Sequence, residues 1–319
     1  MDTTNSTIKG KAYEYACVLA LQDLVSPIRE IEIVENESLE IAKARYDNDI
    51  AEQDKSDMLL SARSGIQAII EMEPKIIEDD NDRLTISLQP DSVATKLGDI
   101  RDVLIIRREL SWEIGVSVKH NHAALKHSRL SARLDFGNVW FGVPCSQTYF
   151  NEIAPIFAKL KTLKDNGELW RNLPDKEASV YVPLLNAFVS EFNRLNGSGS
   201  ITADLVKYLL GSNGKDYYKL IHNNNHTATI MPFNLFGTLN QTTDATQPII
   251  IIPEIELPTR IIEMTFKENS KTTVILTMNN GWSISFRIHN ASSKVETSLK
   301  FDIQLQSKPE DIFYINREW

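Results

Sequence analysis

The sequence predicts a protein of the α+β class with an α/β core, in which helices flank a mixed β-sheet and a β-rich region forms the C-terminal part. Segments with helical and with strand-like hydrophobic spacing alternate through the first two hundred residues, and five strand-like runs follow one another after residue 248. The chain has 319 residues, about two typical domain lengths. Its content of 42% apolar and 24% charged residues is that of a globular protein and excludes disordered, collagen-like and coiled-coil chains.

The first hundred residues are expected to alternate helices with short strands. Apolar residues recur at helical spacing from Ala12 to Leu24, and a longer acidic segment with similar spacing ends before Pro74. Alternation of apolar with polar residues predicts the strands. The predicted helices cover 9–25 and 37–72, and the predicted strands cover 28–34 and 84–88.

A hairpin and a group of helices are expected next. Two strand-like runs, 102–107 and 112–119, are separated by polar residues that suit a tight turn. Helical composition or spacing then recurs at 122–134, 147–163, 176–195 and 202–210. The polar segment 196–200 is the best linker candidate, so the sequence is divided into regions 1–195 and 196–319.

The second region is expected to be rich in strands. Asn279-Asn280-Gly281 is a strong signal for a hairpin turn. On the strand that follows it, Trp282, Ile284, Phe286 and Ile288 alternate onto one face, which indicates core packing. The predicted strands cover 249–252, 260–266, 272–278, 282–289 and 297–305.

Several functional classes are excluded by what the sequence lacks. No stretch approaches about 20 uncharged apolar residues, so no membrane span or membrane partner is expected. Cys17 and Cys145 cannot form a disulfide framework or a structural zinc site on their own. There is no Walker-type phosphate loop, dinucleotide-binding glycine motif or Gly-x-Ser-x-Gly elbow. The start lacks a basic segment followed by an apolar one, so a cytoplasmic location is expected.

Charge is distributed unevenly along the chain, whose net charge is −9. Residues 1–99 contain 21 Asp and Glu against 10 Lys and Arg. Residues 101–133 contain 7 Lys and Arg against 3 Asp and Glu, together with three histidines. The sequence therefore offers a basic segment to an anionic partner in spite of the acidic average.

One pair of strands carries residues suited to phosphodiester chemistry. Alternation along 112–119 sends Glu113, Ser117 and Lys119 to the same face, and Asp102 opens the preceding strand. A carboxylate can bind Mg²⁺, and a lysine can orient the attacking water and stabilise charge on the phosphate. The spacing alone is weak evidence, because a lysine that ends a strand is usually solvated and an aspartate before an apolar run is usually a turn residue.

Several short motifs, spread over most of the chain, carry a resemblance to a known family. They are Gly10-Lys-Ala-Tyr-Glu14, Gly98-Asp-Ile-Arg-Asp-Val103, Val118-Lys-His-Asn-His122, Lys126-His-Ser-Arg-Leu-Ser131, Leu134-Asp-Phe-Gly137, the run from Gly281 to Ser293, and Ser298-Leu-Lys-Phe-Asp302. With these motifs the sequence resembles type II restriction endonucleases of the HaeIII family, which have a PD-(D/E)XK nuclease core.

The resemblance implies a role for each residue of the hairpin. Asp102 matches the first metal-binding acid and Lys119 the catalytic lysine. Ser117 stands where the family pattern has a second acid, which leaves that ligand open between Glu14 on the first helix and Glu113. We favour Glu14, although it could be an ordinary exposed carboxylate.

The resemblance also implies contacts with DNA. The basic stretch after Lys119 is expected to contact phosphates; a zinc site there is disfavoured because no cysteine lies nearby, and the alternative is a solvated helix. Polar residues around the hairpin of the second region are expected to read base edges in the major groove, although exposed strand residues need no function. The first set is His120, Asn121, His122, Lys126, His127 and Arg129, and the second is Arg287, His289, Asn290, Lys294 and Lys300.

The functional expectation is a Mg²⁺-dependent type II restriction endonuclease for double-stranded DNA. By resemblance it recognises the palindrome GGCC and cuts between G and C to give blunt ends, as a homodimer and alongside a DNA methyltransferase for the same site. Region 1–195 would be the catalytic core and region 196–319 the DNA-recognition region. Ser117 motivates one alternative, a DNA-binding module with a degenerate, non-cleaving core; a β-rich protein-interaction domain is another.

Overall fold

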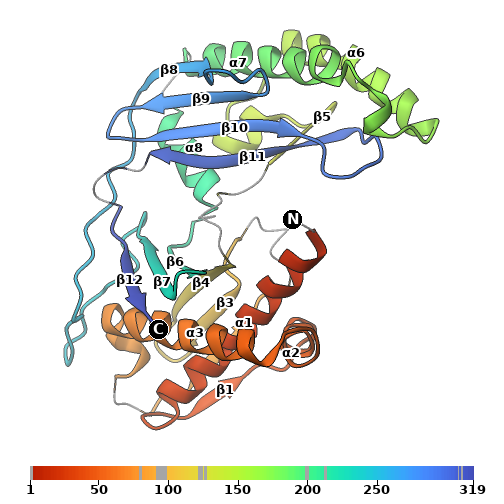
Figure 1. The fold of residues 1–319 in the computed structure, drawn as a ribbon. Helices are drawn as coiled ribbons and strands as arrows, with labels where there is room; N and C mark the ends of the chain where they lie inside the picture. Colours follow the sequence, from red (N-terminus) through yellow and green to blue (C-terminus); the bar gives the residue numbers. More distant parts are fainter. Residues whose placement is uncertain are drawn as a thin grey trace. The chain divides into compact units, whose positions relative to one another are not determined.

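The structure is a computed structural model in which residues 3–78, 81–90, 99–120, 125, 128–197, 201–211, 214–307, 309 and 312–319 are described. The chain forms two compact units (Figure 1). Unit 1 comprises Met1–Ala123, Ser212–Ile255 and Asp311–Trp319, and unit 2 comprises Ala124–Gly211 and Glu256–Glu310. Regions 1–195 and 196–319 therefore each contribute segments to both units.

Unit 1 is built on a seven-stranded mixed sheet, in the order β1-β2-β3-β4-β6-β7-β12. The strands are β1 (Ile31–Ile33), β2 (Leu84–Leu88), β3 (Val103–Arg107), β4 (Trp112–His120), β6 (Tyr217–Asn223), β7 (Thr227–Phe233) and β12 (Ile315–Glu318). The helices are α1 (Thr3–Val25), α2 (Glu37–Asp49) and α3 (Glu52–Met72), followed by the single turn η1 (Pro74–Ile76).

Two strand pairs of this sheet are parallel, β1 with β2 and β4 with β6, and the other pairs are antiparallel. The hairpin predicted from 102–107 and 112–119 is confirmed by the pairing of β3 with β4. A parallel pair requires a crossover connection. The connection from β4 to β6 leaves unit 1 and forms the first segment of unit 2.

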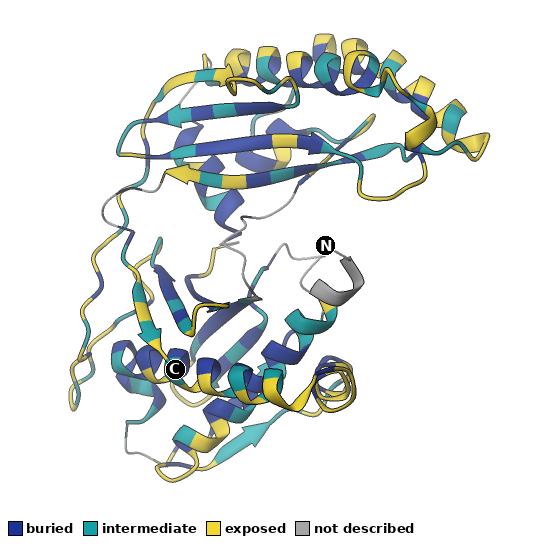
Figure 2. Ribbon diagram, in the orientation of Figure 1, coloured by how far each residue is buried: buried dark blue, intermediate teal, exposed yellow. Residues whose placement is uncertain are grey.

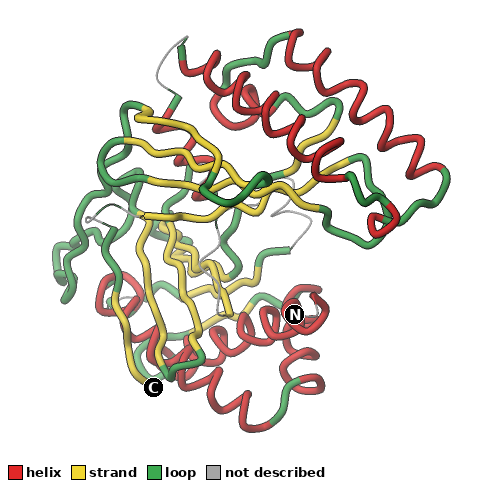
Figure 3. Tube along the Cα trace, turned by 45° about the horizontal axis from the view of Figure 1, so that its top comes forward, coloured by secondary structure: helices red, strands yellow, loops and turns green. Residues whose placement is uncertain are grey.

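The core of unit 1 lies between the sheet and its helices, which gather on one side of the strands (Figure 3). Val103 and Ile105 on β3 face the same way as Ile114 and Val116 on β4, and all four are buried in one hydrophobic cluster with residues of α1 and α3. The opposite face of β4 carries Glu113, Ser117 and Lys119, because side chains alternate along a strand. These three side chains therefore lie on one face of β4, as the sequence predicts.

Unit 2 contains a five-stranded antiparallel sheet, in the order β5-β11-β10-β9-β8. The strands are β5 (Arg129–Ser131), β8 (Ile261–Phe266), β9 (Thr273–Met278), β10 (Ser283–His289) and β11 (Ser298–Ser307). The helices are α5 (Phe136–Phe141), α6 (Gln147–Asp165), α7 (Val182–Asn196) and α8 (Thr202–Leu210), with the short turns η2 (Trp170–Asn172) and η3 (Glu177–Tyr181). Asn280 and Gly281 have φ of 57° and 75°, as a two-residue hairpin turn requires, which confirms the turn predicted between β9 and β10.

An aromatic core fills unit 2. Phe188 on α7 packs against Phe286 of β10 and Phe301 of β11, and Trp140 of α5 stacks on Phe286. Trp282, Ile284, Phe286 and Ile288 are all buried, so the predicted core face of β10 is confirmed. Most of β10 is buried (Figure 2), and Arg287 is the exposed residue of this strand. The fold class, α+β with a β-rich C-terminal region, is confirmed.

Three local predictions differ from the structure. The segment 37–72 forms two helices, because Ile50 and Ala51 adopt extended backbone conformations between α2 and α3. In place of a helix through 122–134, residues 129–131 form β5, which pairs with β11. Residues 249–252 form no strand: the N–H groups of Ile249 and Ile250 both donate to the carbonyl of Glu71 at the end of α3. None of the helices in the described residues is long and apolar enough to cross a membrane.

Candidate active site

The main chain around Asp102 is fixed by its neighbours in the sheet. Asp102 directly precedes β3, and its N–H donates to the carbonyl of Val116 on β4 at 2.9 Å. Its own carbonyl accepts a hydrogen bond of 2.9 Å from the N–H of Gln89, which follows β2. The start of β3 is thus held from both sides, and the Asp102 side chain is presented beside the end of β4.

The carboxylate of Asp102 brings two of the predicted site residues together. Its Oδ2 accepts hydrogen bonds from Lys119 Nζ at 3.1 Å, from Ser117 Oγ at 3.4 Å and from the N–H of Val118 at 2.7 Å. Ser117 is fully buried, whereas the side chains of Asp102 and Lys119 are 22% and 33% exposed. The ion pair is therefore open to a ligand on one side and supported by the strand on the other.

Glu14 adds a second carboxylate to this cluster. It lies on α1, is only 7% exposed, and accepts a hydrogen bond of 3.1 Å from Lys11 one turn earlier. Burial is the main cause that raises its pKa to about 8, and the negative charge of Asp102 raises it further, whereas Lys11 and Lys119 oppose the shift. The side chain is not an exposed helix carboxylate, and its charge interacts with both members of the Asp102–Lys119 pair.

Glu113 has different partners. Its Oε1 accepts a hydrogen bond of 2.7 Å from Arg101, whose guanidinium is also hydrogen-bonded to both carboxylate oxygens of Asp99. Lys215 lies 3.7 Å from the same Glu113 oxygen. Six residues along a strand span roughly 20 Å, so Glu113 is far along β4 from Lys119. The structure places Glu113 in an ion-pair network and not in the Asp102 cluster.

Gly115 explains how Arg101 reaches that network. A Cβ atom at Gly115 would lie 2.3 Å from Cδ of Arg101 and 2.7 Å from its Cβ. Arg101 is buried and held by its ion pairs, so it cannot move aside easily. Because Gly115 has no side chain, the Arg101 side chain can pass over β4 at this point. Arg101 directly precedes Asp102 in the chain.

Lys219 is a neighbour of the site that the sequence reasoning missed. It lies on β6 in register with Ser117 and is only 2% exposed. Burial is the main cause that lowers its pKa to about 7; the positive charge of Lys119 lowers it further and Asp102 opposes the shift. A lysine inside the apolar run from Tyr217 to Ile221 was the available signal, but no strand was predicted there.

The predicted phosphate-contacting stretch is described only at its ends. His120 is the last residue of β4, and Arg129 is an exposed residue at the start of β5 whose Nη1 donates to the carbonyl of Ser298 at 3.3 Å. The other four members, Asn121, His122, Lys126 and His127, lie outside the described residues.

The predicted base-reading residues all belong to unit 2. Arg287 is exposed on β10 and pairs with Asp302 of β11 at 3.1 Å, and the next register pair on the same face is His289 with Lys300. Burial is the main cause that lowers the pKa of His289, and the charge of Arg287 adds to it. Asn290 accepts a hydrogen bond from Tyr181 and donates one to the carbonyl of Ser292, so its amide holds a loop. Lys294 lies in the same connection between β10 and β11.

The donor set at Asp102 fits a magnesium ion bound partly by substrate. Among the described residues, no three His, Cys, Asp or Glu side chains form a group that could hold a metal ion. Mg²⁺ commonly uses one or two carboxylates together with water and phosphate oxygens. Asp102 and Glu14 supply two such carboxylates, and the raised pKa of Glu14 reflects a buried negative environment that a cation would relieve. Glu113, the other predicted candidate for the second ligand, is paired with Arg101.

Comparison with known proteins gives a consistent result over nearly the whole chain. The family model of the HaeIII restriction endonuclease matches residues 10–309. The type II restriction enzyme HaeIII of Haemophilus aegyptius is 42% identical over 320 aligned residues, which cover 99% of each chain. No solved structure matches the sequence.

Proposed function

Because the chain belongs to the HaeIII restriction endonuclease family, we propose that this type II restriction endonuclease cuts double-stranded DNA at GGCC, between G and C, using the Asp102 cluster. The observation that carries the proposal is the convergence of Asp102, Ser117 and Lys119, joined by the charge of Glu14. The hairpin β3–β4 with the parallel neighbour β6 supports a PD-(D/E)XK core. The recognition sequence and blunt ends are proposed from the family resemblance.

In this proposal Asp102 and Glu14 hold Mg²⁺. When bound, the ion neutralises charge on the scissile phosphate and increases the acidity of a bound water. Burial and the charge of Asp102 raise the pKa of Glu14 to about 8, which favours its protonated form, and a cation held by the two carboxylates would lower that pKa. Ser117 stabilises the orientation of Asp102 by its hydrogen bond. The second carboxylate of the proposed site comes from Glu14 on α1 and not from the position of Ser117.

Lys119 acts on the phosphate side of the site. Its ammonium donates to Asp102 Oδ2 and remains one-third exposed, so a second N–H can reach the attacking water or a phosphate oxygen. A positive charge held at that position stabilises the additional negative charge of the transition state more than that of the substrate. Asp102 keeps the flexible lysine side chain in place for this task.

The assembly follows from the symmetry of the proposed site. GGCC reads the same on both strands, and a two-fold protein assembly matches it with one active site per strand. We therefore propose a homodimer on DNA, with unit 2 reading bases. The cell would protect its own DNA by a methyltransferase that acts on the same sequence, and both proteins would work in the cytoplasm.

The test is cleavage of a mapped plasmid with Mg²⁺, compared with Ca²⁺, which should support binding without cutting. Fragments should end at GGCC, and Asp102→Asn and Lys119→Met should each lower the cleavage rate by about 10²–10⁴-fold while binding in Ca²⁺ persists. Asp54→Asn and Lys9→Met are matched controls, because Lys9 and Asp54 form a surface ion pair at the same 3.1 Å in unit 1. Cleavage at other sequences refutes the specificity, and full activity of Lys119→Met refutes the site.

A further inference from the structure

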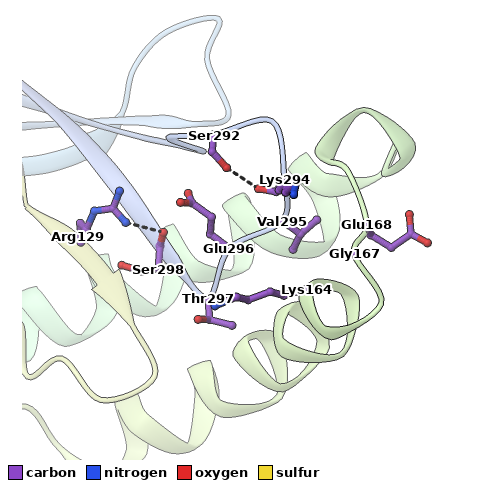
Figure 4. Close-up of a pocket in the computed structure, with 10 residues that line it drawn as sticks. All are labelled: Arg129, Lys164, Gly167, Glu168, Ser292, Lys294, Val295, Glu296, Thr297 and Ser298. Carbon is purple, nitrogen blue, oxygen red and sulfur yellow. Dashed lines mark hydrogen bonds between the residues drawn. The ribbon is translucent and has the colours of Figure 1, made fainter. Parts of the chain in front are cut away.

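A basic groove lies on the surface of unit 2, whereas the residues placed in catalysis belong to unit 1. Two adjoining pockets of about 530 Å³ and 540 Å³ share Lys164 and Thr297 and so form one continuous depression. Figure 4 shows the first of them, between the end of α6, β5 and the connection from β10 to β11. We define the basic groove by its five cationic lining residues, Arg129, Arg133, Lys161, Lys164 and Lys294.

The walls of the groove are held in place by main-chain contacts. The N–H of Val295 donates to the carbonyl of Glu168 at 2.9 Å, and the N–H of Trp170 donates to the carbonyl of Ser293 at 3.0 Å. Leu169 and Lys294 form an antiparallel bridge between the same segments. The segment after α6 is therefore fixed to the β10–β11 connection, and these contacts hold two walls of the groove together.

The positive charge of the groove is only partly compensated. Within the described residues, Arg133, Lys164 and Lys294 take part in no ion pair, although Lys161 pairs with Asp165 at 2.7 Å. The side chains of Lys161 and Asp165 are 71% and 58% exposed, so the ion pair between them is weak. Three acids, Asp165, Glu168 and Glu296, also line the groove, which leaves an excess of two positive charges.

The excess of positive charge in the groove contrasts with the excess of negative charge in unit 1. Unit 2 contains 17 Lys and Arg against 14 Asp and Glu, whereas unit 1 contains 17 against 29. An acidic chain that binds an anionic duplex must present its cations locally. Several cations gathered along one groove of unit 2, most of them without an ion-pair partner among the described residues, are suited to an extended anion.

We propose that the basic groove binds the sugar–phosphate backbone of the duplex flanking the recognised base pairs; this rests on the proposed action on DNA. The α6 residues in the groove run from Ala154 to Asp165, about 17 Å at 1.5 Å per residue. That length equals roughly five base pairs, and lysine side chains contact phosphates as point charges without reading sequence. The groove thus supplies affinity for flanking DNA, and the polar face of β10 and β11 is left for the bases.

The test compares a triple variant, Arg133→Gln with Lys161→Gln and Lys164→Gln, with a control triple, Lys159→Gln with Lys267→Gln and Lys271→Gln. Both triples remove three charges from unit 2, and the control residues do not line the groove. Binding is measured by fluorescence anisotropy in Ca²⁺ over a salt series, on duplexes of about 8 and about 30 base pairs centred on GGCC, the shorter of which leaves only about two base pairs on each side. Thermal melting checks that both variants are folded.

The groove variant should lower the slope of log K against log salt by about two to three units on the long duplex, and change it little on the short one. The control triple should match the wild type, and the cleavage rate at saturating DNA should be unchanged in both. Equal slopes for the groove and control variants would refute the proposed binding of DNA by the groove. An equal decrease of the slope on both duplexes would place the contacts inside the recognised site. If the wild type does not cut GGCC but the groove variant still loses affinity for long DNA, the proposed specificity fails while the groove stands.

Discussion

The two units of the molecule differ in how many charged side chains they bury. In the described part of unit 1, ten side chains of Asp, Glu, Lys, Arg or His are buried, including Glu14, Arg101 and Lys219. In the described part of unit 2, Glu191 alone is buried among these residue types, and aromatic rings fill the interior. Unit 1 therefore buries several charged side chains, and burial shifts the pKa values of Glu14 and Lys219. Unit 2 keeps nearly all of its described charged side chains at the surface.

The difference teaches where each task belongs. Burying an ionisable group is unfavourable unless it is paired, and unit 1 offsets this with pairs such as Arg107–Asp82 and Arg101–Asp99. The lower local dielectric around such groups strengthens their electrostatic effects, which suits chemistry on a phosphodiester. Solvated cations over an apolar core suit contact with a long polyanion, whose affinity depends on salt.

The largest effect is expected from the aromatic core of unit 2. Phe188 is fully buried, and its ring centroid lies 4.9–5.7 Å from those of Phe136, Trp140, Phe286 and Phe301. Phe188→Ala should lower the free energy of unfolding by about 3–5 kcal/mol, measured in urea. Phe266→Ala, at a half-buried to exposed position on the edge strand β8, is the control and should have a much smaller effect. Similar losses for both would mean that this core is not what stabilises unit 2.

The next effect separates the two candidate acids of unit 1. Glu14→Gln should lower the rate of cleavage by about 100-fold or more and raise the Mg²⁺ concentration required, because it removes a proposed ligand. Glu113→Gln should lower the rate by less than about 10-fold, because Glu113 pairs with Arg101. The measurement is a Mg²⁺ titration of plasmid cleavage. The opposite ranking would show that Glu113 is the second acid.

A third prediction contrasts buried glutamates of the two units by their pH dependence. Glu73 in unit 1 is fully buried and accepts hydrogen bonds from Tyr218 and from the N–H of Asn240; burial is the main cause that raises its pKa to about 7. The folded state therefore retains a proton that the unfolded state releases from about pH 4.5 upward. The free energy of unfolding should fall as pH rises from about 4.5 to about 7, by up to about 3 kcal/mol, and Glu73→Gln should remove this loss.

Glu191 in unit 2 is expected to show the opposite sign. Burial is the largest influence and raises its pKa, but hydrogen bonds from Arg194 and Ser146 together outweigh it and lower the pKa. Its contribution is present above the pKa of the unfolded state and is lost as pH falls through the folded pKa. Urea unfolding measures both slopes, for Glu73→Gln between about pH 5 and about pH 8 and for Glu191→Gln between about pH 3 and about pH 5. The contrast between the units fails if both variants shift stability in the same direction with pH.

The smallest effect concerns sequence reading by unit 2. Arg287→Ala should weaken binding to a GGCC duplex by about 1–3 kcal/mol and leave a scrambled duplex nearly unchanged, because base contacts carry sequence information and phosphate contacts do not. Arg171→Ala, another exposed arginine of unit 2, serves as the control. Anisotropy in Ca²⁺ on both duplexes is the measurement. A uniform loss on the two duplexes would assign Arg287 to the backbone.

The sequence predicted the parts of the site that depend on local alternation. The spacing of Ser117 and Lys119 on one strand, with Asp102 opening the paired strand, is realised because a tight hairpin fixes the register of β3 and β4. The fold class was also predictable, since helical and strand periods differ along the chain. The roles of these residues stay predictions until the variants are measured.

Other parts depend on distant residues and had no local signal. Lys219 meets Ser117 only because β6 returns beside β4 after the first segment of unit 2. The burial of Glu14 depends on the packing of α1 against the sheet, and β5 exists through its pairing with β11, about 170 residues later in the chain. The apolar run at 249–252 resembled a strand, yet Asn240 and Glu71 bind its backbone instead.

The interleaving of the two units has a consequence for synthesis. Every segment of unit 2 precedes β12 in the chain, so all of unit 2 has left the ribosome before the strand that pairs with β7. If unit 2 folds first, as domains generally fold as units, it shortens both long loops that unit 1 must close, from β4 to β6 and from β7 to β12. The sheet of unit 1 would then be completed last, when β12 pairs with β7, although the residues of the proposed nuclease site all precede unit 2 in the chain.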